Sequence, residues 1–176
     1  MGEPDATEKT MVAKFLSPYF PAKTTDQNKE LSKLLVYVEA PSAVEKTMAL
    51  LAIAKDNTDT QQKTISESAD LILRNPQYGM DIAAMLARIP PMQQTWYANV
   101  LTKAKNGWTP DLQEKYFQWF YKAFGYKGGV SFVGFINTAR KTALANVDKD
   151  KFEYFNKISG DSIVLNSRAG IKVGTV

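Results

Sequence analysis

Apolar residues recur along most of the chain at the spacing that places them on one face of a helix. The clearest example, with apolar positions i, i+3, i+4 and i+7, consists of Leu31, Leu34, Leu35 and Val38. The same period predicts helices over residues 5–16, 26–38, 44–54, 65–74, 78–89, 92–105, 110–124, 131–143 and 148–158. Residues 55–64 are polar and rich in turn formers, which predicts a loop. The pattern therefore predicts an all-α fold.

Residues that can cap a helix stand at several of these boundaries. Asp5 followed by Glu8 has the spacing of a capping box, in which each side chain accepts a hydrogen bond from the backbone N–H of the other residue. Thr109 before Pro110 predicts a later helix start, because the Thr hydroxyl caps a free N–H and Pro fits the first helical position. Further N-caps are predicted at Asp26, Ser131 and Asp148.

Residues 106–135 hold ten of the twenty aromatic residues of the chain. In the helix predicted there, Tyr116, Phe120 and Phe124 recur every fourth residue, whereas charged and amide side chains occupy the opposite face. Aromatic side chains bury large areas where helices pack. We therefore interpret this stripe as part of a helical core, with a ligand-stacking platform as the alternative.

Short connections join the predicted helices into antiparallel pairs. The pairs begin near residues 26, 65, 92 and 131, a period of roughly 30 to 40 residues that is typical of helical repeats. We predict one domain over residues 1–160, built as a right-handed α-solenoid of helix hairpins in which each pair buries its apolar face against its neighbours. A compact helical bundle is the alternative. Residues 161–176 predict an irregular or strand-like tail, because Gly and Ser separate weakly alternating apolar residues.

The composition removes several kinds of chemistry. The chain has no Cys and no His, which excludes Ser-His and Cys-His nucleophiles, zinc sites built from those residues and its own haem attachment. Asp148, Asp150 and Glu153 could hold a metal, but the intervening lysines favour a solvated helix start. The glycine-rich loop at 125–129 could hold an anion, although a turn between helices explains it better. We predict no enzyme activity, no cofactor and no metal.

The sequence also lacks the usual signals for a membrane. No apolar run approaches 18 residues, so no membrane span is predicted. The first residues do not combine a basic region with an apolar stretch, so no signal peptide is predicted on this chain.

The charge is uneven along the chain. Residues 1–60 carry seven lysines and nine acids, whereas residues 61–176 carry an excess of six positive charges. One basic surface could form, if neighbouring helices align, from Arg88, Lys103, Lys105, Lys115, Lys122, Lys127, Arg140 and Lys141. As candidate interaction residues we single out Trp108, Tyr126, Lys127, Lys103, Lys105, Arg140 and Lys141. An acidic protein partner suits this set, and nucleic acid or another polyanion is the alternative.

Three stretches of the chain resemble a known family. They are NKELSKLLVYVEAPSAVEKTMALL at 28–51, NGWTPDLQEKYFQWF at 106–120 and GGVSFVGFI at 128–136. They look like the HEAT-like helical region of large exported bacterial proteins, of the planctomycete and Bacteroidetes type, that also carry a sugar-dehydrogenase-like β-propeller and a c-type cytochrome domain. The resemblance covers roughly residues 21–160.

The resemblance implies a connecting helical module with a periplasmic or otherwise exported location. It also implies that the partners are neighbouring propeller or cytochrome domains of a parent protein. The haem-attachment sequence Cys-x-x-Cys-His and the short strands of a propeller are missing from this chain, so no catalytic residue of the family carries over. The expected function is a non-catalytic helical scaffold or protein-interaction module.

Overall fold

The computed structural model describes residues 4–54, 67, 69–127 and 129–163, and within these ranges the protein is all-α, without a strand. This confirms the predicted fold class. The helices are α1 (Ala6–Leu16), the short 3-10 helix η1 (Ser17–Tyr19), α2 (Thr25–Tyr37), α3 (Ala43–Ile53), α5 (Ala69–Arg74), α6 (Pro76–Leu86), α7 (Met92–Leu101), α8 (Pro110–Ala123), α9 (Gly129–Leu144) and α10 (Lys149–Ile158). The predicted loop at 55–64 and the predicted helix start at 65–66 lie outside the described residues.

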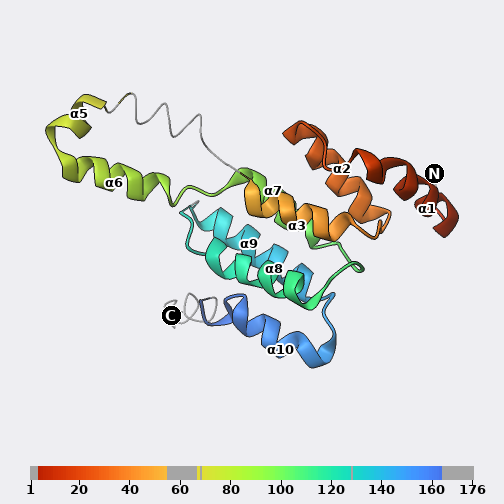
Figure 1. Ribbon diagram of the computed structural model, residues 1–176. Coiled ribbons are helices and arrows are strands. Elements are labelled where there is room, and N and C mark those ends of the chain that lie inside the picture. The colour runs from red at the N-terminus through yellow and green to blue at the C-terminus, as the bar shows by residue number, and fades with distance from the viewer. Residues whose placement is uncertain (1–3, 55–66, 68, 128, 164–176) are drawn as a thin grey trace, which may run out of the picture.

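The main body of the fold is a stack of packed helices (Figure 1). Helices α2 and α3 pack against each other and both pack against α7, which in turn contacts α9. Helix α8 contacts α3 on one side and α9 and α10 on the other. The N-terminal helix α1 lies against α2, at the end of the stack opposite α10.

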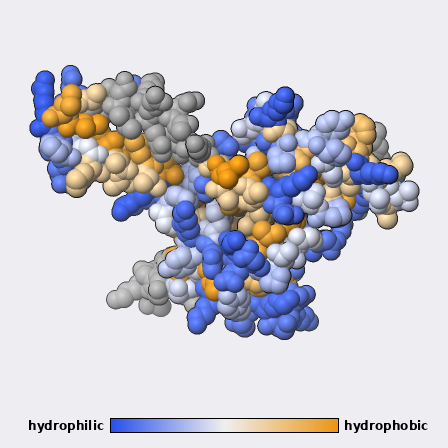
Figure 2. All heavy atoms as spheres, viewed as in Figure 1, coloured by the Kyte–Doolittle hydropathy of each residue, from blue (hydrophilic) through white to orange (hydrophobic). Residues whose placement is uncertain are grey.

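Helices α5 and α6 project from this body as an arm (Figure 1). They pack mainly against each other, and the first helix pair, α2 and α3, packs directly on α7. An array built strictly in sequence order would place the second pair between the first and the third. Outside the stack the arm leaves apolar side chains uncovered, since Leu73 is 81% exposed and Met85 is also exposed. Figure 2 shows apolar side chains gathered on this arm and hydrophilic ones over α10.

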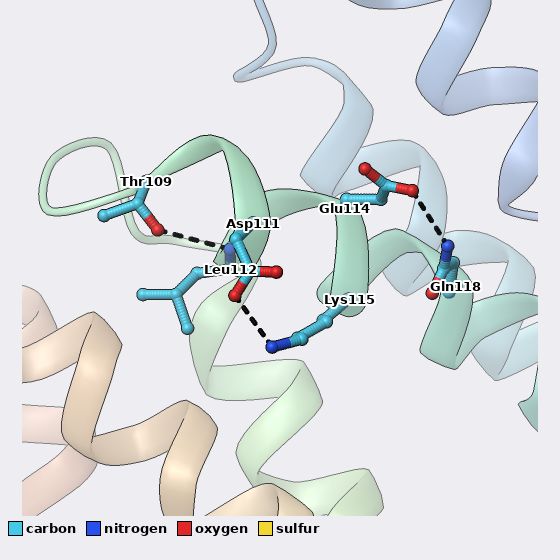
Figure 3. A network of polar contacts seen from close by, with 6 residues as sticks. All are labelled: Thr109, Asp111, Leu112, Glu114, Lys115 and Gln118. Carbon is cyan, nitrogen blue, oxygen red and sulfur yellow. Dashed lines mark hydrogen bonds and ion pairs between the residues drawn. The ribbon is translucent and has the colours of Figure 1, made fainter.

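The start of α8 follows the prediction closely (Figure 3). The Thr109 hydroxyl accepts a hydrogen bond from the backbone N–H of Leu112 at 3.3 Å, and Pro110 occupies the first turn. On the exposed side of the helix, Lys115 pairs with Asp111 at 2.7 Å and the Gln118 amide donates to Glu114 at 3.1 Å. Pairs four residues apart on a helix add a few tenths of a kcal/mol each, roughly 0.2–0.5. The cap and the surface pairs stabilise the helix locally, whereas burial of its aromatic side chains turns that face of α8 inward.

The aromatic stripe forms the centre of the core. Tyr116, Phe117 and Phe120 are almost fully buried, and their rings contact one another with centroids 5.1 to 6.3 Å apart. Phe155 of α10 stacks on Phe117 at 4.8 Å, which joins the last helix to the stripe. The buried Tyr116 hydroxyl donates to the backbone carbonyl of Ala98 in α7 at 2.7 Å. The interpretation of this stripe as core is confirmed.

Several predicted helix starts need correction. Helix α2 is capped by Thr24, whose hydroxyl accepts from the N–H of Gln27 at 3.3 Å, and not by Asp26, which lies in the first turn. Asp148 stands at the N-cap of α10 but makes no capping bond, because its carboxylate pairs with Lys151 at 3.0 Å. Helix α9 already begins at Gly129, before Ser131. The sequence predicts each start from the capping chemistry of one side chain, but neighbouring residues compete for the N-cap position.

The turn at Gly107 and the two ends of the described chain complete the description. Gly107, between α7 and α8, has a φ of 84°, and a Cβ there would meet the carbonyl oxygen of Pro41 at 3.1 Å, so the connection after α7 lies directly against the one before α3. The predicted capping box is present at the start of α1, where the side chains of Asp5 and Glu8 each accept a hydrogen bond from the backbone N–H of the other residue. Of the predicted tail, residues 161–163 are helical and the remainder lies outside the described residues.

Candidate functional site

A surface groove of about 940 Å³ lies where α1, α2 and α7 meet. Its length follows α2 from Glu30 to Tyr37 and α7 from Trp96 to Val100, and the chain leaving α7 adds Lys103 and Lys105 at its border. The apolar part of its surface is formed by Leu16, Leu31, Leu34, Val36, Tyr37, Trp96 and Val100. The volume is within the range of roughly 300–1,000 Å³ that binding sites occupy.

The apolar surface arises because α2 has more apolar residues than its core face can bury. Leu35 and Val36 point into the core and are 0% and 5% exposed, whereas Leu34 and Tyr37 remain 41% and 48% exposed. Across the groove Trp96, which the helical pattern predicts to point inward, is 38% exposed. Contiguous exposed apolar surface with a polar border is typical of interaction sites.

Lysines give the groove its charge. Four of its lining residues are lysines, namely Lys9, Lys33, Lys103 and Lys105, against the two acids Glu30 and Glu39. A fifth lysine, Lys29, lies over the Trp96 ring with its Nζ 5.9 Å from the ring centroid. The site is therefore an apolar channel with an excess of positive charge at its border.

Glu39 is held in place at one end of the groove. Its φ of 58° lies in the left-handed region, which is uncommon for a residue other than glycine. One carboxylate oxygen lies 3.6 Å from Lys9 Nζ, and the other accepts a hydrogen bond of 2.6 Å from the Asn106 amide. Lys9 also lies 5.6 Å from the centre of the Tyr37 ring. Because Glu39 and Lys9 neutralise each other, the excess positive charge comes from Lys33, Lys103 and Lys105, which outnumber the remaining acid, Glu30.

The structure brings two of the predicted interaction residues into this groove. Lys103 and Lys105 both line it and are exposed. Lys127 and Lys141 are also exposed, but they lie outside the groove, on the loop before α9 and on α9 itself. The backbone N–H of Lys127 donates to the Arg88 carbonyl at 2.7 Å, which ties this loop to the end of the α6 segment.

Arg140 requires a correction, because it is only 3% exposed and does not contribute to a basic surface. Its Nε donates to the Ser159 hydroxyl at 2.7 Å, and its Nη2 donates to the Asn156 carbonyl at 2.8 Å and to the Asn156 side-chain oxygen. Burial lowers the pKa of the Arg140 guanidinium, and the charge of Asp161 opposes this. Arg140 binds the C-terminal end of α10, a position that favours a cation.

Trp108 and Tyr126 are half-buried and pack against the core. The Trp108 indole N–H donates to the Ala104 carbonyl at 3.0 Å, and its ring lies 5.0 Å from the Tyr116 ring, tilted by 32°. Trp108 also lines a small cavity of about 10 Å³ between α7, α8 and α9. This space has room for about one water molecule, so it cannot hold a ligand.

The chemistry available for catalysis or metal binding is sparse in the described part of the chain. No three Asp or Glu side chains there lie close enough to hold a metal ion. Asp148, one of the acids considered above as a metal ligand, forms an ion pair with Lys151 instead, and the hydrogen bond between them raises the pKa of Lys151. Burial raises the pKa of Tyr116 well above its ordinary value, and its hydroxyl is enclosed in the core. In the same residues no helix is both long and apolar enough to cross a membrane.

The apolar members of the groove were missed by reasoning from the sequence. The periodicity shows that Leu34 and Trp96 lie on apolar helix faces, and such faces are normally assigned to the core. The available signal was the width of the apolar face of α2, because the five consecutive residues 34–38 are all apolar or aromatic.

Comparisons of the chain with protein-family models, with curated proteins and with solved structures found no match. The fold and the groove therefore carry the functional argument.

Proposed function

We propose that this protein is a non-catalytic helical scaffold whose groove between α1, α2 and α7 docks an acidic segment of a protein partner. The single observation that carries the proposal is the combination of exposed apolar residues Leu34, Tyr37 and Trp96 with the bordering cations Lys33, Lys103 and Lys105. Apolar contact supplies affinity for such a segment, and complementary charge supplies speed and selectivity of association.

The proposal includes a parent protein of the kind whose helical region this chain resembles. In that setting the groove would dock a neighbouring propeller or cytochrome domain of a larger exported redox protein. The reading frame on either side of these 176 residues tests this part, because propeller strands before them or a Cys-x-x-Cys-His sequence after them is expected. Flanking sequence that encodes neither would contradict the parentage and leave the docking groove to be tested by itself.

Binding of nucleic acid has less support from the structure. Arg140 is buried in the protein, and Lys103 and Lys105 border an apolar channel. A surface that binds phosphates uses many cations, and its affinity falls steeply with salt. A groove that buries apolar side chains retains much of its affinity when surface charges are screened.

A displayed library of random 16-residue peptides tests the docking function. We expect selection on the wild-type protein to enrich sequences that combine acidic with large apolar residues. These peptides should bind the double variant Lys103→Glu/Lys105→Glu at least tenfold more weakly. The matched control, Lys122→Glu/Lys141→Glu, makes the same change of charge outside the groove and should bind within twofold of the wild type.

Two outcomes would contradict the proposed function. One is a selection that yields no peptide whose binding depends on Lys103 and Lys105. The other is a short DNA or RNA duplex that displaces the selected peptides at 150 mM salt, which would favour a polyanion site. Because all four substituted lysines are exposed, the circular dichroism of each variant should match that of the wild type, which would confirm that the fold is intact.

A further inference from the structure

The form of the docked segment can be inferred from what surrounds the groove. Its sides are helices α1, α2 and α7, whose backbone N–H and C=O groups are bonded within each helix except at the ends. An extended peptide would need backbone partners, which in other proteins are provided by the edge of a sheet. The described residues contain no such edge. A helical peptide satisfies its own backbone, so it loses no hydrogen bonds on entering an apolar channel.

The dimensions of the groove also suit a short helix. Its lining residues on α2 run from Glu30 to Tyr37, which is a rise of about 10 Å at 1.5 Å per residue. The lining on α7 starts at Trp96 and continues past the helix to Lys105. A docked helix of about two to three turns would present side chains i, i+3, i+4 and i+7 to this length.

The distribution of charge sets the character of the exposed flanks of such a helix. Lys33 belongs to α2, whereas Lys103 and Lys105 follow α7, so cations stand on both elements that border the apolar channel. Two acids also line the groove: Glu39 is paired with Lys9 and accepts a hydrogen bond from Asn106, whereas Glu30 is outnumbered by Lys33, Lys103 and Lys105. A helix with one apolar face flanked by carboxylates suits the apolar channel and the net positive charge of its border.

We infer that the occupant of the groove is an acidic amphipathic α-helix of a partner protein. Its apolar face lies on Leu31, Leu34 and Trp96, and its carboxylates pair with Lys33, Lys103 and Lys105. The inference rests on the proposed function and adds the conformation and the charge pattern of the partner. The Lys29 side chain, which lies over the Trp96 ring, completes the cationic border on that side.

Four synthetic 15-residue peptides test this inference. The first carries Leu at helical spacing and Glu at the flanking positions, and the second has the same composition with Leu and Glu in alternation. The third is the first peptide with Pro at its centre, which breaks a helix. The fourth replaces every Glu of the first by Lys. Each is labelled with fluorescein, and binding is measured by anisotropy at 150 mM salt.

We expect the helical acidic peptide to bind and to gain helical circular dichroism on binding. The alternating and the Pro-containing peptides should bind at least tenfold more weakly, and the basic peptide should show no binding. Leu34→Glu should weaken the first peptide at least tenfold, because it places an acid in the apolar channel. Tyr121→Glu changes an exposed aromatic residue of α8 outside the groove, 56% exposed against 41% for Leu34, and should change the affinity of the first peptide less than twofold.

Failure of the inference can be told apart from failure of the proposed function. If the alternating peptide binds as tightly as the helical one, and both depend on Lys103 and Lys105, the helical conformation is wrong and docking stands. The same conclusion follows if acidic library peptides, whose binding depends on Lys103 and Lys105, bind without gaining helical circular dichroism. If neither library nor synthetic peptides depend on the groove, the proposed function falls. Self-association that Leu34→Glu abolishes would identify a second copy as the occupant and overturn the inference.

Discussion

Replacement of Arg140 gives the sharpest test of how the C-terminal helix is held. In Arg140→Met the aliphatic stem keeps its packing, but the guanidinium is removed from its contacts with Ser159 and Asn156. Those contacts join α9 to the last turn of α10, which also packs on α8 through Phe155 and Phe117. The change therefore weakens the attachment of a whole helix, and no interaction surface is altered because Arg140 is buried.

The expected loss follows from the contacts of the guanidinium. A hydrogen bond to a charged group contributes about 1.5–3 kcal/mol, and Arg140 donates three. Two effects reduce their sum. The Ser159 hydroxyl can still donate to the Asn156 carbonyl, at 3.1 Å, and Met avoids the cost of burying a charge, which is the cause of the lowered pKa of Arg140. We expect about 3 kcal/mol of lost stability, or a melting temperature lower by about 6–12 °C.

The measurement is thermal and urea unfolding followed by circular dichroism at 222 nm. Lys141→Met is the matched control, because it removes the same charge from the next residue, which is exposed; it should change the free energy of unfolding by no more than about 0.5 kcal/mol. Arg140→Lys should fall between the wild type and Arg140→Met, since a lysine keeps the charge without the planar fork of donors. A melting temperature of Arg140→Met within 2 °C of the control would show that the guanidinium does not hold α10 in place.

Two further predictions concern the aromatic core. Trp108→Ala should lower the free energy of unfolding by about 2–3 kcal/mol, because a half-buried indole, its hydrogen bond to Ala104 and its contact with Tyr116 are lost; peptide binding measured well below the melting temperature should be unchanged, and a selective loss of binding would contradict this structural role. Tyr116→Phe should cost about 1 kcal/mol at pH 7 in urea unfolding. Because burial raises the pKa of Tyr116, the unfolded chain loses this proton first, so wild-type stability holds below about pH 10 and falls above it. Between pH 10 and 12 the free energy of unfolding of Tyr116→Phe should fall less steeply than that of the wild type. Tyr121→Phe, which changes an exposed tyrosine, is the control and should keep the wild-type slope. Equal slopes for Tyr116→Phe and the wild type would contradict the role given to the buried Tyr116 hydroxyl.

The helices themselves are largely determined by local sequence. The capping box of Asp5 and Glu8 and the Thr109-Pro110 start of α8 act through atoms within one turn, so short-range chemistry is enough to locate them. The aromatic face of α8 is equally local, since a stripe repeating every fourth residue has one way to be buried when a helix packs. Asp26 shows the limit of this reasoning, because Thr24 lies two residues away and provides the cap instead.

The all-α class and the apolar face of each longer helix can be predicted from the amino-acid sequence, because both depend on interactions within a few residues. The packing of the helices in three dimensions decides how much of each apolar face is covered. It placed α5 and α6 outside the main stack, buried Arg140 and left Leu34 and Trp96 on a surface groove. These outcomes depend on which distant helices meet, and that choice is made by the fit of whole apolar surfaces rather than by any local pattern.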